Sequence, residues 1–151
     1  ELIYTDTETG EKYTPHVIEP TFGLSRLVGI ILFDSYSKDG ERVVLKLSPK
    51  LAPYKAAVFP LLANKKELVD KAINIYRQLK KEGIVPVIFD DRGNIGKRYY
   101  AQDEIGTPWC VTVDYQTLED NTVTIRDRDS ATQIRMASGE LKTYFNDKLS
   151  S

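Results

Sequence analysis

The sequence predicts an α/β fold in which helices pack on a mixed sheet of five strands. From residue 54 onward, apolar segments of strand length alternate with segments whose apolar residues recur at helical spacing. Glycine, proline and asparagine residues between these segments indicate turns. Because the connections are short, successive strands and helices can follow one another through right-handed crossovers. We therefore expect residues 54–151 to form one compact unit with five strands and about three helices.

The first strand and helix of this unit are predicted from residues 56–83. Residues 56–62 are almost entirely apolar, which is typical of a buried strand. Asn64, followed three residues later by Glu67, resembles a capping box at the start of a helix. Gly83 can end that helix. Its inward stripe is expected to consist of Leu68, Ala72, Ile73, Tyr76 and Leu79.

A second helix is expected between two further buried strands, residues 84–89 and 109–113. Asn94 is a favourable N-cap, and Gly106 before Pro108 predicts the end of this helix. Helical spacing places three of its apolar or aromatic residues in the core, namely Ile95, Tyr99 and Ile105.

Three basic residues, Arg92, Lys97 and Arg98, gather at the start of that helix with no acid between them. A helix N-terminus is already electropositive, so cations gain nothing from the helix dipole there. Exposed amides and arginine side chains both suit phosphate, and the cluster therefore predicts an anionic ligand. The alternative is a solvated helix end whose charges serve solubility.

The last part of the chain adds two strands and a helix. Residues 122–126 alternate between apolar and polar, which predicts a strand with one wet face. Ser130 with Gln133 predicts a short helical turn, and residues 134–137 predict a brief strand. Ser138 then starts a final helix, whose apolar side is expected to contain Leu141, Tyr144, Phe145 and Leu149.

The first 53 residues predict a β-hairpin, a helix and a connector. A turn at residues 8–10 separates two extended runs, and the second run, residues 12–19, ends at Pro20. Apolar residues then recur at helical spacing from Phe22 to Leu32. Residues 37–41 predict a polar loop and residues 43–47 a short strand. We place a domain boundary at residue 53, which divides the chain into 1–53 and 54–151.

Composition narrows the classes of function. The chain has 151 residues with 21 basic and 22 acidic side chains, so contact with nucleic acid must be local. Cys110 is the single cysteine and is expected to be a small buried hydrophobe, which fits a reducing compartment. The single histidine, His16, cannot form a zinc site alone, and no metal ligands are expected. No apolar run approaches the roughly 20 residues of a membrane span. No P-loop or dinucleotide fingerprint is present.

Two acidic or mixed clusters allow more than one interpretation. Asp90 and Asp91 follow a predicted strand, where α/β sheets place ligand-binding groups, but a solvated turn explains them equally well. The run 126–129 alternates arginine and aspartate. It is either a set of mutual ion pairs at a strand end or a polar reader of nucleic-acid bases.

Five segments together resemble the C-terminal anticodon-binding domain of class IIa aminoacyl-tRNA synthetases. Within that class they are most similar to the glycyl-tRNA synthetases of the archaeal and eukaryotic homodimeric type. The segments are 51–55, 58–61, 94–99, 103–108 and 126–130, with Gln133 and Arg135. Independently, residues 15–26 resemble motif 3, the last strand and helix of the class II catalytic core. The resemblance extends from about residue 13 to residue 149.

This resemblance implies roles near an ATP and glycine site. Arg26 matches the motif 3 arginine that binds the terminal phosphates of ATP, and Glu19 matches the acid that receives the ammonium group of glycine. Thr21 takes the place of a serine near the amino acid. The alternative for Glu19 and Arg26 is a buried ion pair between strand and helix. Motifs 1 and 2 are absent, so we interpret the chain as the C-terminal part of a synthetase that does not activate glycine by itself.

The resemblance also implies partners. The parent enzyme would be a homodimer in the cytoplasm, would use ATP and magnesium, and would join glycine to its tRNA through an adenylate. No cofactor is expected on this fragment, whose partners would be glycine tRNA and the remaining catalytic domain, with no membrane. The alternatives are a synthetase-like accessory protein that binds nucleic acid and a free-standing domain of the anticodon-binding type with a regulatory or interaction role. With Asp90 as a further acceptor, the expected tRNA-binding residues are Arg92, Lys97, Arg98, Arg126, Asp127 and Arg128.

Overall fold

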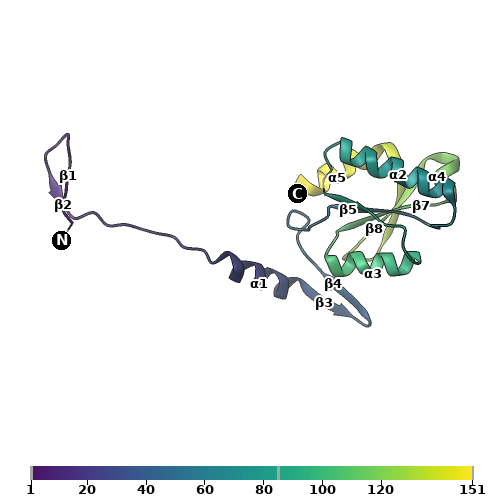
Figure 1. Ribbon diagram of the computed structural model, residues 1–151, viewed down its shortest axis with the longest axis horizontal. Coiled ribbons are helices and arrows are strands. Elements are labelled where there is room, and N and C mark those ends of the chain that lie inside the picture. The colour runs from purple at the N-terminus through teal and green to yellow at the C-terminus, as the bar shows by residue number, and fades with distance from the viewer. Residues whose placement is uncertain (1, 85, 151) are drawn as a thin grey trace.

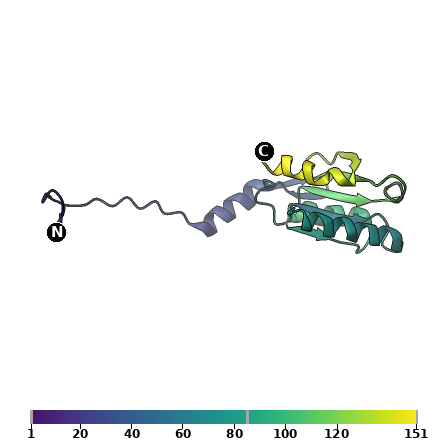
Figure 2. The same cartoon turned by 90° about the horizontal axis from the view of Figure 1, so that it is seen from above.

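The computed structural model describes residues 2–84 and 86–150, which form an extended N-terminal arm and a layered α/β domain (Figure 1). The arm begins with a small hairpin, in which β1 (Tyr4–Thr5) pairs antiparallel with β2 (Lys12–Tyr13). After a segment without regular structure comes helix α1 (Leu24–Ser35). Figure 2 shows that this arm projects away from the domain. None of the 12 residues of α1 is buried.

The centre of the domain is a five-stranded mixed sheet with the order β6-β5-β7-β8-β9. Strands β5 (Ala56–Pro60), β6 (Val87–Phe89) and β7 (Trp109–Val113) are parallel. Strands β8 (Thr122–Asp127) and β9 (Gln133–Ala137) continue the sheet in antiparallel pairing. Because β5 to β7 run in the same direction, their carboxyl ends meet at one edge of the sheet, where β8 begins and β9 ends.

Helices cover both faces of the sheet (Figure 1). On one face lie α2 (Lys66–Lys81) and α5 (Leu141–Ser150), which follows a short 3-10 turn, η1 (Ser138–Glu140). A six-residue helix, α4 (Tyr115–Asp120), packs beside α2. The opposite face is covered by α3 (Ile95–Ile105). This helix runs from the carboxyl ends of the parallel strands back to the opposite end of the sheet, where β7 begins.

The alternation of side chains along the strands explains this layering. The larger core, on the α2 and α5 side, is centred on Val58, Val111 and Phe145, all 0% exposed. The adjacent strand residues point the other way and form a smaller core under α3, which contains Phe59 and Cys110. Cys110 is buried as predicted, and burial raises the pKa of its thiol.

A connector joins α1 to the sheet. Strand β3 (Tyr36–Asp39) follows α1 directly and pairs antiparallel with β4 (Arg42–Leu45), which packs against α3. The ammonium group of Lys55 holds the end of the connector, because Nζ donates to the carbonyl oxygens of Pro49, Lys50 and Ala52, each at 2.9 Å. Burial lowers the pKa of Lys55.

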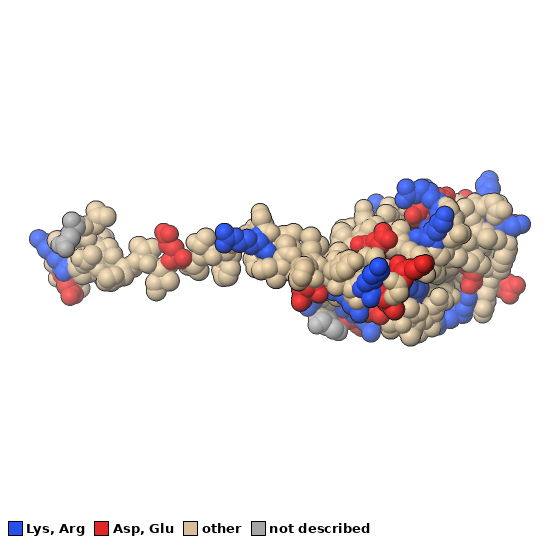
Figure 3. Space-filling model, turned by 90° about the horizontal axis from the view of Figure 1, so that it is seen from below, with Lys and Arg blue, Asp and Glu red and all other residues tan. Residues whose placement is uncertain are grey.

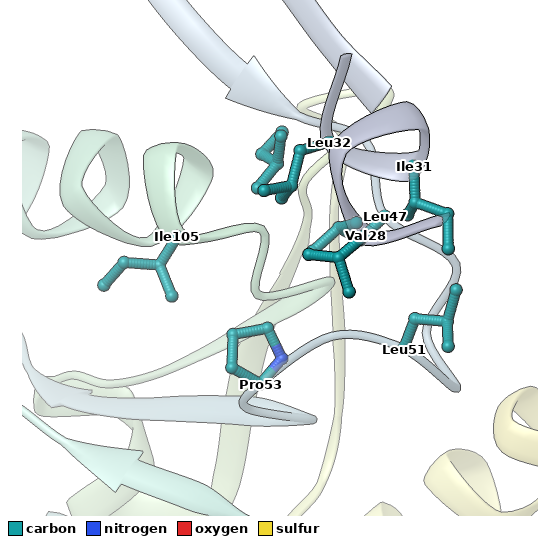
Figure 4. A pocket seen from close by; sticks show the side chains of 8 residues that line it. Val28, Ile31, Leu32, Leu47, Leu51, Pro53 and Ile105 are labelled. Carbon is teal, nitrogen blue, oxygen red and sulfur yellow. The ribbon is translucent and has the colours of Figure 1, made fainter. Parts of the chain in front are cut away.

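An apolar groove of about 350 Å³ lies between α1 and the connector. Figure 4 shows Val28, Ile31 and Leu32 on one side of this open space and residues of the connector on the other. Ile105 also lines it and is 36% exposed, so its predicted place in the core is wrong. Tyr99 does pack inward, with its ring 5.8 Å from that of Phe59.

The five-stranded sheet, the hairpin and the helices centred on α1, α2, α3 and α5 confirm the predicted fold class, with α4 as an additional helix. Thr122 and Thr124 are half-buried beside fully buried Val123 and Ile125, so the predicted alternation along β8 is present. The face that carries the threonines is not wet along its whole length, because Arg126 on the same face is buried. Val85, in the predicted strand 84–89, lies outside the described residues.

Several local predictions were wrong. Residues 36–39 form strand β3, where a polar loop was expected. The cap of α2 is Lys65 without a side-chain hydrogen bond, so Asn64 and Glu67 form no capping box. Gln133 begins β9, and the carboxylate of Asp127 accepts hydrogen bonds from the Asp129 and Ser130 amides, so the chain makes an Asx turn here in place of a helical turn.

Candidate nucleic-acid interface

The carboxyl end of the parallel strands carries the start of α3. Gly93 has φ +63°, a left-handed conformation that turns the chain from β6 toward the helix. Asn94 caps α3 as predicted, because its side-chain oxygen accepts a hydrogen bond from the Lys97 amide at 2.9 Å. The exposed side chain of Lys97 therefore lies on the same first turn as the amides of the α3 N-terminus.

Arg92 is held at this edge by Asp90. Its Nε and Nη2 donate to the two carboxylate oxygens of Asp90 at 3.0 and 3.3 Å. The side chain of Arg92 is 85% exposed, whereas that of Asp90 is 6% exposed. Burial raises the pKa of Asp90, but hydrogen bonds from Arg92 outweigh this, and the pKa of that carboxyl lies below its ordinary value. Asp90 thus positions an available cation.

Arg98 lies beneath this edge and is only 2% exposed. Its guanidinium group donates to the carbonyl oxygens of Pro60, Leu61 and Gly93, and it lies 5.7 Å from the centre of the Phe59 ring. Among residues 2–84 and 86–150, Nε of Arg98 has no hydrogen-bond partner. Arg98 therefore ties together the loops that follow β5 and β6, and its donors are directed to the protein interior.

Two adjacent hollows share Arg98 and Gly93 in their walls. One, of about 280 Å³, is lined on its remaining sides by Asp90, Arg92, Lys97 and Ala101. The other, of about 400 Å³, is lined by residues 61–64 and by Asn94 and Ile95. Figure 3 shows basic and acidic side chains interspersed over one face of the domain, with no large area of a single charge sign on that face.

Arg126 and Arg128, also expected to bind tRNA, lie elsewhere. Asp127 pairs across the sheet with Trp109, the first residue of β7, which places it at the end opposite Arg92 and Lys97. Arg126 donates to both oxygens of buried Asp103 at 2.9 and 3.1 Å. Burial lowers the pKa of Arg126, but its hydrogen bonds to Asp103 outweigh this effect and raise it.

The guanidinium group of Arg128 is also directed inward. Arg128 is 2% exposed and donates to the carbonyl oxygens of Gly106 and Leu47 at 2.7 and 2.9 Å. The carboxylate of Asp127 closes the Asx turn described above. The structure therefore does not bring the expected tRNA-binding cations together, but separates them into two groups at opposite ends of the sheet. Arg98, Arg126 and Arg128 hold the domain together.

Glu19, Thr21 and Arg26 lie on the arm. All three are exposed, and Arg26 is in the first turn of α1. The alternative of a buried ion pair between Glu19 and Arg26 is therefore wrong. Arg26 is also separate from the core that contains Trp109.

Sequence reasoning missed Arg42 and Asp103, which belong to the group at the opposite end of the sheet. Nε of Arg42 donates to Asp103 at 2.7 Å. A usable signal was the position of Asp103, four residues after the inward-facing Tyr99 on the same helix. A carboxylate on the inward side of a helix requires a buried partner.

The fold and its motifs define an anticodon-binding domain, and the comparison with protein families agrees. Residues 55–148 match the family described as the anticodon binding domain, and the chain belongs to this family.

Comparison with individual proteins gives two relatives that are glycine–tRNA ligases. The chain is 51% identical over 154 residues to the glycine–tRNA ligase of Clostridium tetani, covering 99% of this chain and 32% of that protein. It is 50% identical over 151 residues to the glycine–tRNA ligase of Borreliella burgdorferi, covering 97% of this chain and 33% of that protein. The chain thus spans about a third of the length of these relatives. None of these comparisons tests the archaeal and eukaryotic subtype, which stays a prediction.

A solved structure shares the fold. The prolyl-tRNA synthetase of Cryptosporidium parvum, complexed with L-proline and AMP, matches with a TM-score of 0.70 and 24% identity. The match covers 83% of this chain and 26% of that one. At this identity the likeness supports the fold alone.

Two further observations concern the described residues. Within residues 2–84 and 86–150, no helix is both long and apolar enough to span a membrane. The same residues bring no three His, Cys, Asp or Glu side chains into a group that could hold a metal ion.

Proposed function

We propose that this chain is the C-terminal part of a glycine–tRNA ligase and that residues 54–151 bind the anticodon loop of glycine tRNA. The observation that carries the proposal is the identity of about half of all residues to glycine–tRNA ligases across nearly the whole chain. Membership in the anticodon-binding family supports the assignment of the second unit. The proposed boundary at residue 53 precedes the family match, which begins at residue 55.

Within this domain, the carboxyl end of the parallel strands is the proposed contact with the RNA loop. Arg92 and Lys97 have exposed charges beside the amides of the α3 N-terminus, which suits the phosphates of a single strand. The hollows beside them offer room for an unstacked base. Arg98, Arg126 and Arg128 are not proposed as ligands, because their donors are used inside the domain.

The proposed reaction of the whole enzyme has two steps. Glycine displaces pyrophosphate from ATP to give an adenylate, and the tRNA then takes the glycyl group and releases AMP. We assign binding of the ATP phosphates to Arg26 and binding of the glycine ammonium group to Glu19, with Thr21 beside it. Their charges fit these ligands, since a guanidinium group binds phosphate oxygens and a carboxylate binds ammonium. Magnesium would accompany ATP, and no residue of this chain is assigned to it. A cytoplasmic homodimer is part of the same proposal.

Discrimination between anticodons tests the proposal. The purified chain should bind a stem-loop with a glycine anticodon at least tenfold more tightly than the same stem-loop with a scrambled anticodon, as measured by fluorescence anisotropy. Equal affinities would contradict the proposed function.

Charge removal at Lys97 locates the contact. Lys97→Gln should weaken binding and reduce the slope of log affinity against log salt by about 0.7, the value for one phosphate contact on a single strand. Lys81→Gln is the matched control, because Lys81 is exposed near the far end of α2. An unchanged slope in Lys97→Gln would exclude this residue.

Whether this chain activates glycine without the rest of the enzyme can be tested separately. The purified chain should show no glycine-dependent exchange of pyrophosphate into ATP, because Glu19 and Arg26 alone cannot position both substrates for in-line attack. Measurable exchange would contradict this part of the proposal.

A further inference from the structure

Asp103 connects three segments of the chain at the end of the sheet opposite Arg92 and Lys97. Its carboxylate is 0% exposed and lies on the last turns of α3. It accepts one hydrogen bond from Arg42 on β4 and two from Arg126 on β8. One buried carboxylate therefore joins the connector, the helix and the sheet.

Arg128 adds a second set of contacts between the same segments. It donates to the carbonyl oxygens of Gly106, at the end of α3, and Leu47, in the connector. Its own carbonyl oxygen accepts a hydrogen bond from Nη2 of Arg42. We call Arg42, Asp103, Arg126 and Arg128 the arginine joint.

The backbone in contact with the joint is tightly packed. Gly106 has φ +89°, and a Cβ atom added there would lie 2.9 Å from the carbonyl oxygen of Leu45. Side chains other than hydrogen are therefore excluded both by conformation and by space. The connector and the end of α3 touch without room for a methyl group.

We propose that the arginine joint fixes the direction of α1 relative to the anticodon-binding domain and that Arg42 is its positioning residue. Helix α1 continues into β3 without an intervening loop, and β3 pairs with β4 at four positions. The direction of α1 therefore follows that of the β3–β4 hairpin. Arg42 is the residue of that hairpin whose side chain reaches Asp103.

The directional preference of hydrogen bonds explains why the arginine joint, and not the apolar groove, sets the direction of α1. The groove between α1 and the connector is open, with about 350 Å³ of space, and apolar contact has no directional preference. Arginine–carboxylate and arginine–carbonyl contacts require a defined orientation of the guanidinium plane. Six such hydrogen bonds join the connector, α3 and the sheet: two from Arg42 to Asp103 and the Arg128 carbonyl, two from Arg126 to Asp103, and two from Arg128 to the carbonyls of Gly106 and Leu47. Arg128 also donates to both carboxylate oxygens of the adjacent Asp129.

The consequence for catalysis rests on the proposed function. α1 carries Arg26, the proposed ATP ligand, whereas α3 extends from the joint to Lys97, the proposed RNA contact. A rigid joint between α1 and α3 would hold a tRNA that is bound by its anticodon at a fixed position relative to the ATP site.

The geometric claim can be tested on the 151-residue chain. Spin labels at Ile30→Cys on α1 and Arg77→Cys on α2 would report the distance between arm and domain by double electron–electron resonance. Both positions are exposed, and buried Cys110 should remain unlabelled. We expect a narrow distance distribution in the parent and a width at least twice as large in Arg42→Gln. The domain should stay folded in this variant, because Asp103 keeps both hydrogen bonds from Arg126.

Lys38→Gln is the matched control, since it removes an exposed cation from the same hairpin and should leave the width unchanged. An unchanged width in Arg42→Gln would overturn the proposal. If circular dichroism shows that Arg42→Gln is unfolded, Arg42→Lys provides the same test. This variant keeps the charge but loses the planar fork, so an unchanged width there is equally decisive.

Activity assays distinguish a positioning role of Arg42 from a contribution to the stability of the protein. In the intact ligase, Arg42→Gln should lower the rate of tRNA charging about tenfold and leave glycine-dependent pyrophosphate exchange within twofold, with partial recovery in Arg42→Lys. Equal loss of both activities would show a merely structural role. If the parent chain fails to bind the glycine anticodon loop, the proposed function fails, whereas the label distances still decide the geometric claim.

Discussion

The two ends of α3 carry similar charges and use them in opposite ways. At the N-terminal end, Arg92 and Lys97 are exposed, and Arg92 shares only one carboxylate. At the C-terminal end, Arg126 and Arg128 are buried, and their donors are occupied by the carboxylates of Asp103 and Asp129 and by backbone carbonyls. The comparison teaches that a run of arginines in a sequence does not by itself indicate a surface for nucleic acid. The partners of each guanidinium group decide whether its charge can reach a ligand.

The largest expected effect is the loss of Arg126. Arg126→Met leaves the buried carboxylate of Asp103 with Arg42 as its remaining partner, and removal of one member of a buried pair costs about 3–5 kcal/mol. Urea unfolding followed by circular dichroism would measure this change in the free energy of unfolding. The matched variant Arg77→Met, on the exposed side of α2, should stay within about 0.5 kcal/mol of the parent. Similar stabilities of Arg126→Met and Arg77→Met would contradict the conclusion that the arginines at the C-terminal end of α3 have a structural role.

An intermediate effect is expected at the cap of α3. Asn94→Ala removes the acceptor of the Lys97 amide and should cost about 1 kcal/mol, whereas Asn94→Asp should retain the stability. The same urea experiment applies. An unchanged stability in Asn94→Ala would show that the side-chain cap is unimportant.

The smallest effect concerns acid stability at the exposed end. The pKa of Asp90 in the folded chain is depressed, so its contribution to stability is present above the ordinary pKa of an aspartate, about 3.9, and is lost as the pH falls through the lower folded value. Arg92→Gln removes the side-chain hydrogen bonds and the charge that lower this pKa. It leaves the hydrogen bond from the amide of residue 92, which lowers the pKa, and burial, which raises it. The pKa of Asp90 should therefore rise, as measured by NMR titration of its carboxyl carbon. An unchanged value would show that Arg92 does not hold Asp90.

The sheet and the main helices could be predicted because their apolar residues recur with the right period. The hairpin strand β3 could not, because Ser37, Lys38 and Asp39 are polar and largely exposed, and a two-stranded ribbon needs no apolar face. Helix α4 has only six residues, and its signal was the reciprocal cap between Asp114 and Thr117.

The candidate site was predicted in part. The start of α3 was found from its cap and from the absence of acids, both of which are local properties of the sequence. The burial of Arg98 was not found, because its acceptors include Pro60 and Leu61, which approach only after the β5 and β6 loops have come together. Burial of charge in this domain depends on contacts between distant segments, which periodicity does not encode.

The buried thiol under α3 has a practical consequence. Cys110 packs with Ala57 and Phe59 against Ile95 and Tyr99 of the helix. A thiol reagent can reach it only when α3 separates from the sheet, and while the thiol is buried its raised pKa keeps it protonated and unreactive. The rate at which the native chain consumes such a reagent therefore measures how often this helix lifts, and RNA that clamps its first turn should slow that rate.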